Sequence, residues 1–235
     1  EITAKGGKDG AGIGGGEGSN IRGNMLISGG TITATGGEDG AGIGAGQHGT
    51  FMRDASNRDC TLKITGGTIN ATGGENGAGL GGGDGTSDPR VVISQANANT
   101  TLSINAKGGH NGAGIGAGNG TADYVDITLH GGIITATGGD RAKAGKCSGA
   151  GIGGGSNKEG QDSTGGGSNK IMIYGGTVNA EGWYGAGIGG GQEAVNPAID
   201  IYNGKVSASG IICYYTGAGI GNVTTTESAG TYDEV

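Results

Sequence analysis

Short runs of alternating apolar and polar residues recur along this chain. Three such runs follow one another within residues 62–80, and their apolar members are Leu62, Ile64, Ile69, Ala71, Ala78 and Leu80. Alternate residues of a β-strand point to the same side, so we expect these six to face inward. The residues expected to face outward are Lys63, Thr68, Asn70, Thr72, Gly77, Gly79 and Gly81.

The same pattern recurs in other parts of the chain. The residues expected inward there are Leu26, Ile32, Ala34, Ala41 and Ile43, and then Ile171, Ile173, Val178, Ala180, Ala186 and Ile188. The apolar period of an amphipathic helix and a supply of strong helix formers are both missing. The pattern therefore predicts an all-β protein made of short strands.

A glycine-rich segment, GAGIGGG or a close variant, begins at Gly10, Gly40, Gly77, Gly112, Gly149, Gly185 and Gly217. Successive copies are 30 to 37 residues apart, and most follow GGTITATGG or a relative of it. One such unit cannot bury its apolar side alone, so the copies must stack. Three strands per copy predict a parallel β-helix, a three-sheet solenoid of about seven coils, and the crossover rule favours the right-handed form. We expect one repeat domain over residues 1–222 and a polar tail or cap over residues 223–235.

The composition is unusual, with 63 glycines and 2 prolines among 235 residues and only 32% hydrophobic residues. Collagen is excluded because glycine does not recur at every third position. Low hydrophobicity alone would favour disorder, but the regular placement of the apolar residues favours a packed core. Sharp corners explain much of the glycine, because they need positive φ angles that other residues rarely adopt.

One glycine corner carries a polar residue in each copy. Its sequence is GGKDG, GGEDG, GGENG or GGHNG, and stacking would align Asp9, Asp39, Asn76 and Asn111 in a column. We interpret this column as a ladder of side-chain hydrogen bonds between coils, with bound calcium as the alternative. The outward glycines of GAGIGGG also allow two interpretations, namely tight packing or a bare face that a glycan or a protein could approach.

The net charge is −7 and the sequence pI is about 4.9. No basic patch is present, which disfavours nucleic acid and anionic membranes as partners. No apolar run approaches the roughly 20 residues that span a bilayer, so membrane insertion is not expected. The chain starts within a repeat, at EITAKGG, which is typical of a piece of a longer protein.

Three cysteines, Cys60, Cys147 and Cys213, form no metal-binding spacing. Cys147 and Cys213 fall in equivalent turns two coils apart. Coils rise about 4.8 Å each, so their Cα atoms would lie beyond the roughly 7 Å limit for a disulfide. We expect three free thiols.

The inward pairs, GGTITATGG and GAGIGGG together resemble the right-handed β-helices of the pectate-lyase-like superfamily. They are especially similar to glycine-rich repeat regions of secreted surface proteins of Firmicutes. The resemblance extends from Ile2 to about Asn222. It implies polysaccharide lyases, glycosidases, adhesins and carbohydrate-binding modules alike, at a secreted or cell-surface location. No position matches a catalytic motif of the superfamily, so no catalytic residue is assigned.

Aromatic residues make up only 4% of the chain, yet four of them fall in two equivalent corners. Trp183 and Tyr184 lie between the second and third strands of the sixth copy, and Tyr214 and Tyr215 lie at the same place in the seventh. Neighbouring coils would bring these side chains within about 5–10 Å of one another. Exposed aromatic faces stack on sugar rings, so these four are the predicted ligand-binding residues. A cap over the end of the stack and a protein interface are the alternatives.

Long loops follow GAGIGGG and are expected along one edge, at residues 47–61, 84–100, 119–124, 156–170 and 192–197. They and their surroundings carry Asp54, Asp59, Asp84, Asp88, Asp123, Glu159, Asp162 and Glu193. We expect most of these to be solvated charges, with calcium binding or paired acid–base chemistry as alternatives. His48, His110 and His130 fall at different places along the coil and form neither a zinc cluster nor a triad. No metal site and no cofactor are therefore expected, although calcium is possible.

The leading functional hypothesis is a non-catalytic carbohydrate-binding or adhesive surface-display module of a larger secreted protein, with a polysaccharide or glycan as partner. The first alternative is a polysaccharide lyase or glycoside hydrolase, or a fragment of one, that uses carboxylates on the long-loop edge. The second alternative is a structural spacer.

Overall fold

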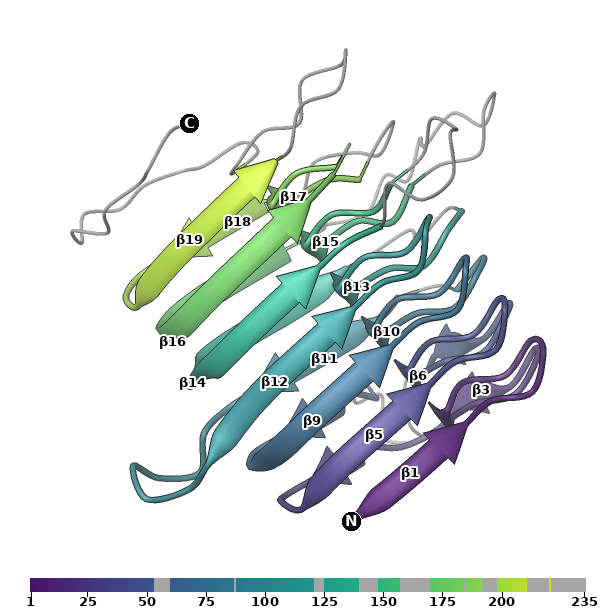
Figure 1. The fold of residues 1–235 in the computed structure, drawn as a ribbon, viewed down its shortest axis with the longest axis horizontal. Coiled ribbons are helices and arrows are strands. Elements are labelled where there is room, and N and C mark those ends of the chain that lie inside the picture. The colour runs from purple at the N-terminus through teal and green to yellow at the C-terminus, as the bar shows by residue number, and fades with distance from the viewer. Residues whose placement is uncertain are drawn as a thin grey trace.

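The computed structural model describes residues 1–52, 60–86, 88–120, 125–139, 148–156, 170–183, 185–191, 198–210 and 220. In these ranges every regular element is a strand, and each strand pairs in parallel with its counterpart in the next coil (Figure 1). No helix long and apolar enough to cross a membrane occurs in them. The predicted right-handed parallel β-helix is confirmed.

Two walls of the coil form one sheet that runs on through a bend, with 11 strands in the described ranges. The first face consists of β4 (Met25–Ile27), β8 (Leu62–Ile64), β11 (Arg90–Ile93), β18 (Ala198–Ile201) and the N-terminal halves of β14 (Asp126–Thr137) and β16 (Lys170–Gly182). The second face consists of β1 (Ile2–Lys5), β5 (Thr31–Thr35), β9 (Gly67–Thr72), β12 (Leu102–Lys107), β19 (Lys205–Gly210) and the C-terminal halves of β14 and β16. β14 and β16 bend through the corner that joins the two faces.

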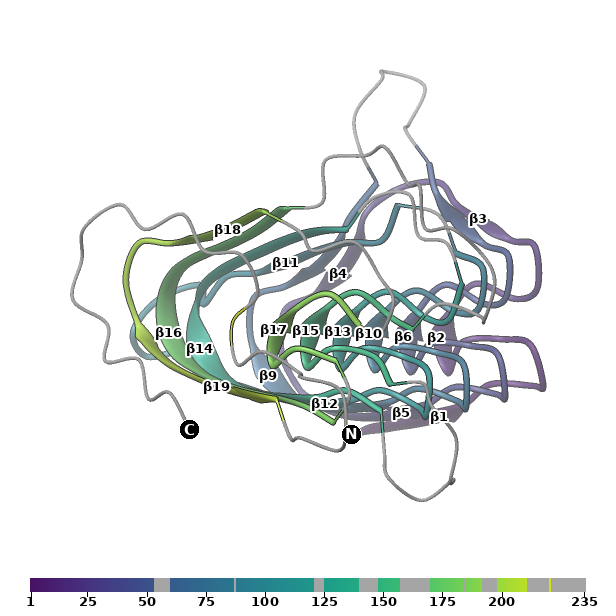
Figure 2. The same ribbon diagram turned by 90° about the horizontal axis from the view of Figure 1, so that it is seen from above.

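The third sheet is made of two-residue strands and lies between the two faces (Figure 2). We call it the inner sheet; its strands are β2 (Ile13–Gly14), β6 (Ile43–Gly44), β10 (Leu80–Gly81), β13 (Ile115–Gly116), β15 (Ile152–Gly153) and β17 (Ile188–Gly189). A parallel bridge from Ile188 to Ile220 extends it into a seventh coil. A small separate sheet pairs β3 (Asn20–Ile21) with β7 (Thr50–Phe51).

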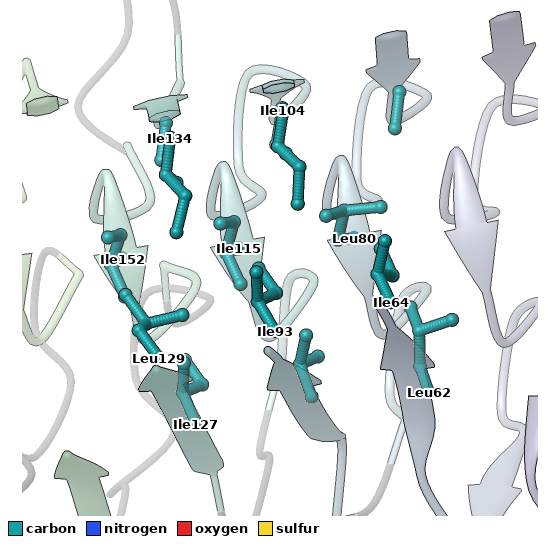
Figure 3. Packing of buried hydrophobic residues seen from close by; sticks show 14 of the residues in the cluster. Leu62, Ile64, Leu80, Ile93, Ile104, Ile115, Ile127, Leu129, Ile134 and Ile152 are labelled. Atoms are coloured by element: carbon teal, nitrogen blue, oxygen red, sulfur yellow. The ribbon is translucent and has the colours of Figure 1, made fainter. Parts of the chain in front are cut away.

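The core fills the space that these three sheets enclose. Each coil contributes apolar residues from the first face, the inner sheet and the second face, as Leu129, Ile152 and Ile134 illustrate (Figure 3). All six residues predicted inward in residues 62–80 are at most 1% exposed. Burying one such large side chain stabilises the fold by about 1.5–3 kcal/mol, so the stability resides in the stacking of coils.

The prediction that Leu26 faces inward is wrong. β4 pairs with β8 so that Met25 lies beside Leu62 and Ile27 beside Ile64, which leaves Leu26 beside the outward Lys63. Leu26 is 63% exposed. Three consecutive apolar residues fit a strand in either phase, and the stacking of this coil on the next one selects the phase.

The interpretation of the GAGIGGG glycines as a bare outer face is also wrong. In each coil a tight bend surrounds the inner strand; in the second coil the Ala41 N–H donates to the Ala45 carbonyl at 3.0 Å. The chain forms a lobe on either side of the bend, and the two lobes bond to each other. Gly42 and Gly44 are therefore buried. Gly44 has φ 139°, and a Cβ there would overlap the carbonyl oxygen of Gly81, which confirms the packing interpretation.

The fourth coil differs from the prediction of a long loop over residues 84–100. β11 lies inside this range as a full member of the first face, with Val91 and Ile93 buried. The extra residues of this coil come after β11, where other coils turn directly on glycine. We call residues 94–101 the corner loop, which projects beside the start of β12 (Figure 1).

Candidate functional site

Among the described residues, three aromatic rings stack at the corner between the first and second faces. They belong to His130, Tyr174 and Tyr202, each of which follows the last inward residue of the first face in three successive coils. The ring centroids of His130 and Tyr174 are 4.8 Å apart with planes 6° from parallel, and those of Tyr174 and Tyr202 are 4.7 Å apart with planes 2° from parallel. We call this column the aromatic ladder. Both tyrosines are 39% exposed, and His130 is exposed as well.

The coil geometry explains why these rings stack. Gly132, Gly176 and Gly204 have φ angles of 94°, 104° and 116°, which turn the backbone through the corner just after each ring. Parallel strands are about 4.8 Å apart, so equivalent side chains on successive coils meet at ring-stacking distance. Ser28, Thr65 and Ser94 hold the same position in earlier coils. The ladder is therefore confined to the fifth, sixth and seventh coils.

Sequence analysis missed the aromatic ladder. The available signal was the residue that immediately precedes the corner in LHGG, IYGG and IYNG. Aligning the copies on this corner, rather than on GAGIGGG, would have placed His130, Tyr174 and Tyr202 in one column.

The corner loop lies next to the His130 end of the aromatic ladder. A Cβ added to Gly131 would come 3.3 Å from the Cβ of Gln95. The Gln95 side-chain amide donates to the carbonyls of Asn97 at 3.1 Å and Thr100 at 2.8 Å, and the Asn99 N–H donates to the Asn97 side-chain oxygen at 3.0 Å. These bonds order the loop from within, while Asn97 and Asn99 stay exposed.

The outer side of the second face carries a regular column of uncharged hydrogen-bonding side chains. Strand register aligns one outward residue from each of the seven coils, and none is charged: Thr3, Thr33, Asn70, Asn105, Thr135, Asn179 and Ser207. Six of these are exposed and Asn70 is half-buried. We call this the central column.

The predicted ladder of polar residues at the glycine corner is confirmed. The Asn76 amide donates to the Asp39 carboxylate at 2.7 Å, and the Asn111 amide donates to the Asn76 carbonyl oxygen at 2.6 Å. Asp39 is almost fully buried. Each amide is both donor and acceptor, so the chain of bonds can continue from coil to coil.

A second buried ladder was not predicted. It follows the residue after GAGIGGG: Asp84 accepts from the side-chain amides of Gln47 at 3.2 Å and Asn119 at 2.9 Å. Ser156 Oγ then donates to the Asn119 side-chain oxygen at 3.5 Å. The prediction that Asp84 is a solvated loop charge is wrong, because Asp84 is 5% exposed. The two ladders fix the register of the lobes.

Replacing Asn76 by aspartate should destabilise the protein by about 1–3 kcal/mol, because it removes a donor and sets a second carboxylate against Asp39 in a buried place. Urea denaturation followed by circular dichroism measures this change. Glu38→Gln, next to Asp39 but exposed, serves as control and should change the stability by less than about 0.5 kcal/mol. Equal stability of the two variants would argue against the ladder.

Most of the sequence-predicted aromatic cluster lies outside the described residues. Trp183 is described and half-buried. Tyr184, Tyr214 and Tyr215 fall outside the described ranges, so the cluster stays a prediction.

The remaining predicted residues are placed as follows. Asp88 is half-buried, while Asp54, Asp59, Asp123, Glu159, Asp162 and Glu193 lie outside the described ranges. Within those ranges no group of three or more His, Cys, Asp or Glu side chains could hold a metal ion. Cys60 is a buried free thiol, as predicted, and its sulfur accepts a hydrogen bond from the Gly23 N–H at 2.8 Å. Cys147 and Cys213 lie outside the described ranges.

The stacked coils define a parallel β-helix solenoid. Comparison with protein families agrees: residues 1–17, 26–47, 62–84, 127–156, 171–192 and 199–222 match the family model described as a β-helix repeat. These segments cover more than half of the chain, which therefore belongs to the β-helix repeat family. No match was found among curated proteins or among solved structures.

Proposed function

We propose that this β-helix is a non-catalytic carbohydrate-binding or adhesive module, displayed at a cell surface or secreted as part of a larger protein. The observation that carries the proposal is the central column, in which seven coils present uncharged hydroxyl and amide groups in register. Polysaccharides present a repeating series of hydroxyl groups. The second face is complementary to them in chemistry and in its repetition.

The physical argument concerns the entropic cost of binding. Hydroxyl and amide side chains both donate and accept hydrogen bonds, as sugar hydroxyls do. Paired β-strands hold the backbone of the central column rigidly, so little backbone ordering is required when a ligand binds. The net charge of −7 disfavours polyanionic ligands such as nucleic acids. A neutral polysaccharide is the partner that meets these conditions.

The enzymatic alternative gains no support from the described carboxylates. Asp84 is committed to a buried ladder, which removes it from the set proposed for acid–base chemistry. A spacer function predicts that no glycan binds, so the binding experiment decides between it and the proposal.

Affinity electrophoresis in gels containing hydroxyethyl cellulose, arabinoxylan or galactomannan tests the proposal. The wild-type chain should be retarded by at least one of these polymers. The double variant Asn105→Ala, Thr135→Ala should bind about tenfold more weakly, because each lost hydrogen bond contributes about 0.5–1.5 kcal/mol.

The matched control is Thr128→Ala, on the first-face half of the same strand as Thr135. It should bind like the wild type. Absence of retardation for the wild type in every gel would overturn the proposal in favour of a spacer. Release of reducing sugar ends from the polymers would contradict its non-catalytic part.

A further inference from the structure

The geometry points to a second contact region, at which the aromatic ladder and the corner loop together bind a neutral oligosaccharide that runs along the β-helix axis. This inference rests on the proposed function and assigns a place and a minimum ligand length to it. Three observations carry it: the exposure of the stacked rings, their order along the axis, and the ordered amide loop at one end.

The rings are more exposed than a purely structural stack would require. Stacking alone could be satisfied by buried aromatic residues, yet both tyrosines are 39% exposed at the outer corner. The Tyr174 hydroxyl makes only a long contact to the sulfur of Met172, at 3.5 Å. The hydroxyl-bearing ring edges therefore face outward, where a ligand can reach them.

The stacking restricts how a sugar can bind. Both faces of Tyr174 are covered, by His130 on one side and Tyr202 on the other. A sugar cannot stack flat on this central ring, so contact there is made through the ring edges and the hydroxyl group. The second face of His130, the end ring of the three, points along the axis toward the coil that carries the corner loop.

That end of the aromatic ladder combines an aromatic face with amide groups. The corner loop approaches Gly131, the residue after His130, through Gln95. It is ordered by its own hydrogen bonds and exposes Asn97 and Asn99. A pyranose ring has C–H groups for aromatic contact and hydroxyls for the amides, so one sugar fits here and the chain continues past Tyr174 and Tyr202.

The direction of the aromatic ladder sets the ligand length. Two ring separations, of 4.8 and 4.7 Å, carry the ladder across three coils. A single sugar at the His130 end cannot also reach Tyr202. A chain of several sugars can contact all three rings and the loop, and binding should strengthen with chain length until the ladder is covered.

Isothermal titration calorimetry with β-linked hexasaccharides and disaccharides of glucose, xylose and mannose tests this inference. The hexasaccharide that binds wild type best should bind at least tenfold more tightly than the matching disaccharide. Tyr174→Ala breaks the ladder in its middle and should weaken hexasaccharide binding about tenfold. Tyr174→Phe keeps the ring and should stay within about threefold of the wild type.

Two further variants keep the test decisive. Asn97→Ala combined with Asn99→Ala alters the loop without touching the rings and should weaken binding severalfold, even if Tyr174→Ala proves unstable in thermal denaturation. Leu26→Ala changes an equally exposed apolar side chain on a distant coil and should bind like the wild type. If the wild type binds none of these sugars and none of the polymers, the proposed function fails. If it binds but the ring and loop variants match it, the function stands and this inference is overturned.

Discussion

Replacing Gly74 by alanine is expected to destabilise the protein by more than about 4 kcal/mol, a loss that exceeds most single substitutions. Gly74 is the second glycine of the GGENG corner in the third coil. A Cβ built there would overlap the Gly37 carbonyl oxygen of the preceding coil. Both groups belong to the backbone, so relief would require the two coils to separate and their hydrogen bonds to break.

The first coil provides a matched control for this substitution. Gly7 is the second glycine of GGKDG, the same corner position, but a Cβ added there would meet nothing within 4 Å. Gly7→Ala should leave stability unchanged or raise it by up to about 1 kcal/mol, because alanine narrows the unfolded ensemble. Urea denaturation followed by circular dichroism measures both variants. Equal effects would mean that the corner glycines serve only the turn conformation, and that the close approach of coils is unimportant.

The repeat made the fold predictable from sequence. Each copy has the same inward positions, so an error in one copy is outvoted by the others, as with the buried Leu62, Ile69 and Leu80. The inner sheet was harder to predict. Alternation in GAGIGGG correctly placed Ile43 inside, but no local pattern shows that the chain folds back on both sides of it and buries the glycines.

The candidate site was much less predictable, because it depends on which side chains meet across coils. The polar ladder through Asn76 was foreseen, since the copies align without gaps at GGENG. The aromatic ladder was missed because the distance from GAGIGGG to the corner changes from copy to copy. Only the strand register shows that His130, Tyr174 and Tyr202 are neighbours.

The same dependence on register appears at Leu26, where three apolar residues in a row hide the phase of the strand. Pairing with β8 is the deciding contact: it sets Leu62 beside Met25 and leaves Leu26 outside. Two leucines on adjacent strands therefore have opposite environments, one fully buried and one 63% exposed. Truncating each of them reports directly on the register.

Leu62→Ala should destabilise the protein by about 2–5 kcal/mol, because it removes buried methyl groups and leaves a cavity between coils that cannot collapse. Leu26→Ala should change stability by less than about 0.5 kcal/mol, since its side chain already contacts water. Thermal and urea denaturation of both variants measure the difference. A register shifted by one residue would reverse the two results, and similar losses in both would mean that β4 has no fixed register on β8. Because a shift of one residue turns every side chain of a strand to the other side, this pair of variants also tests the neighbouring assignments of Met25 and Ile27 to the core.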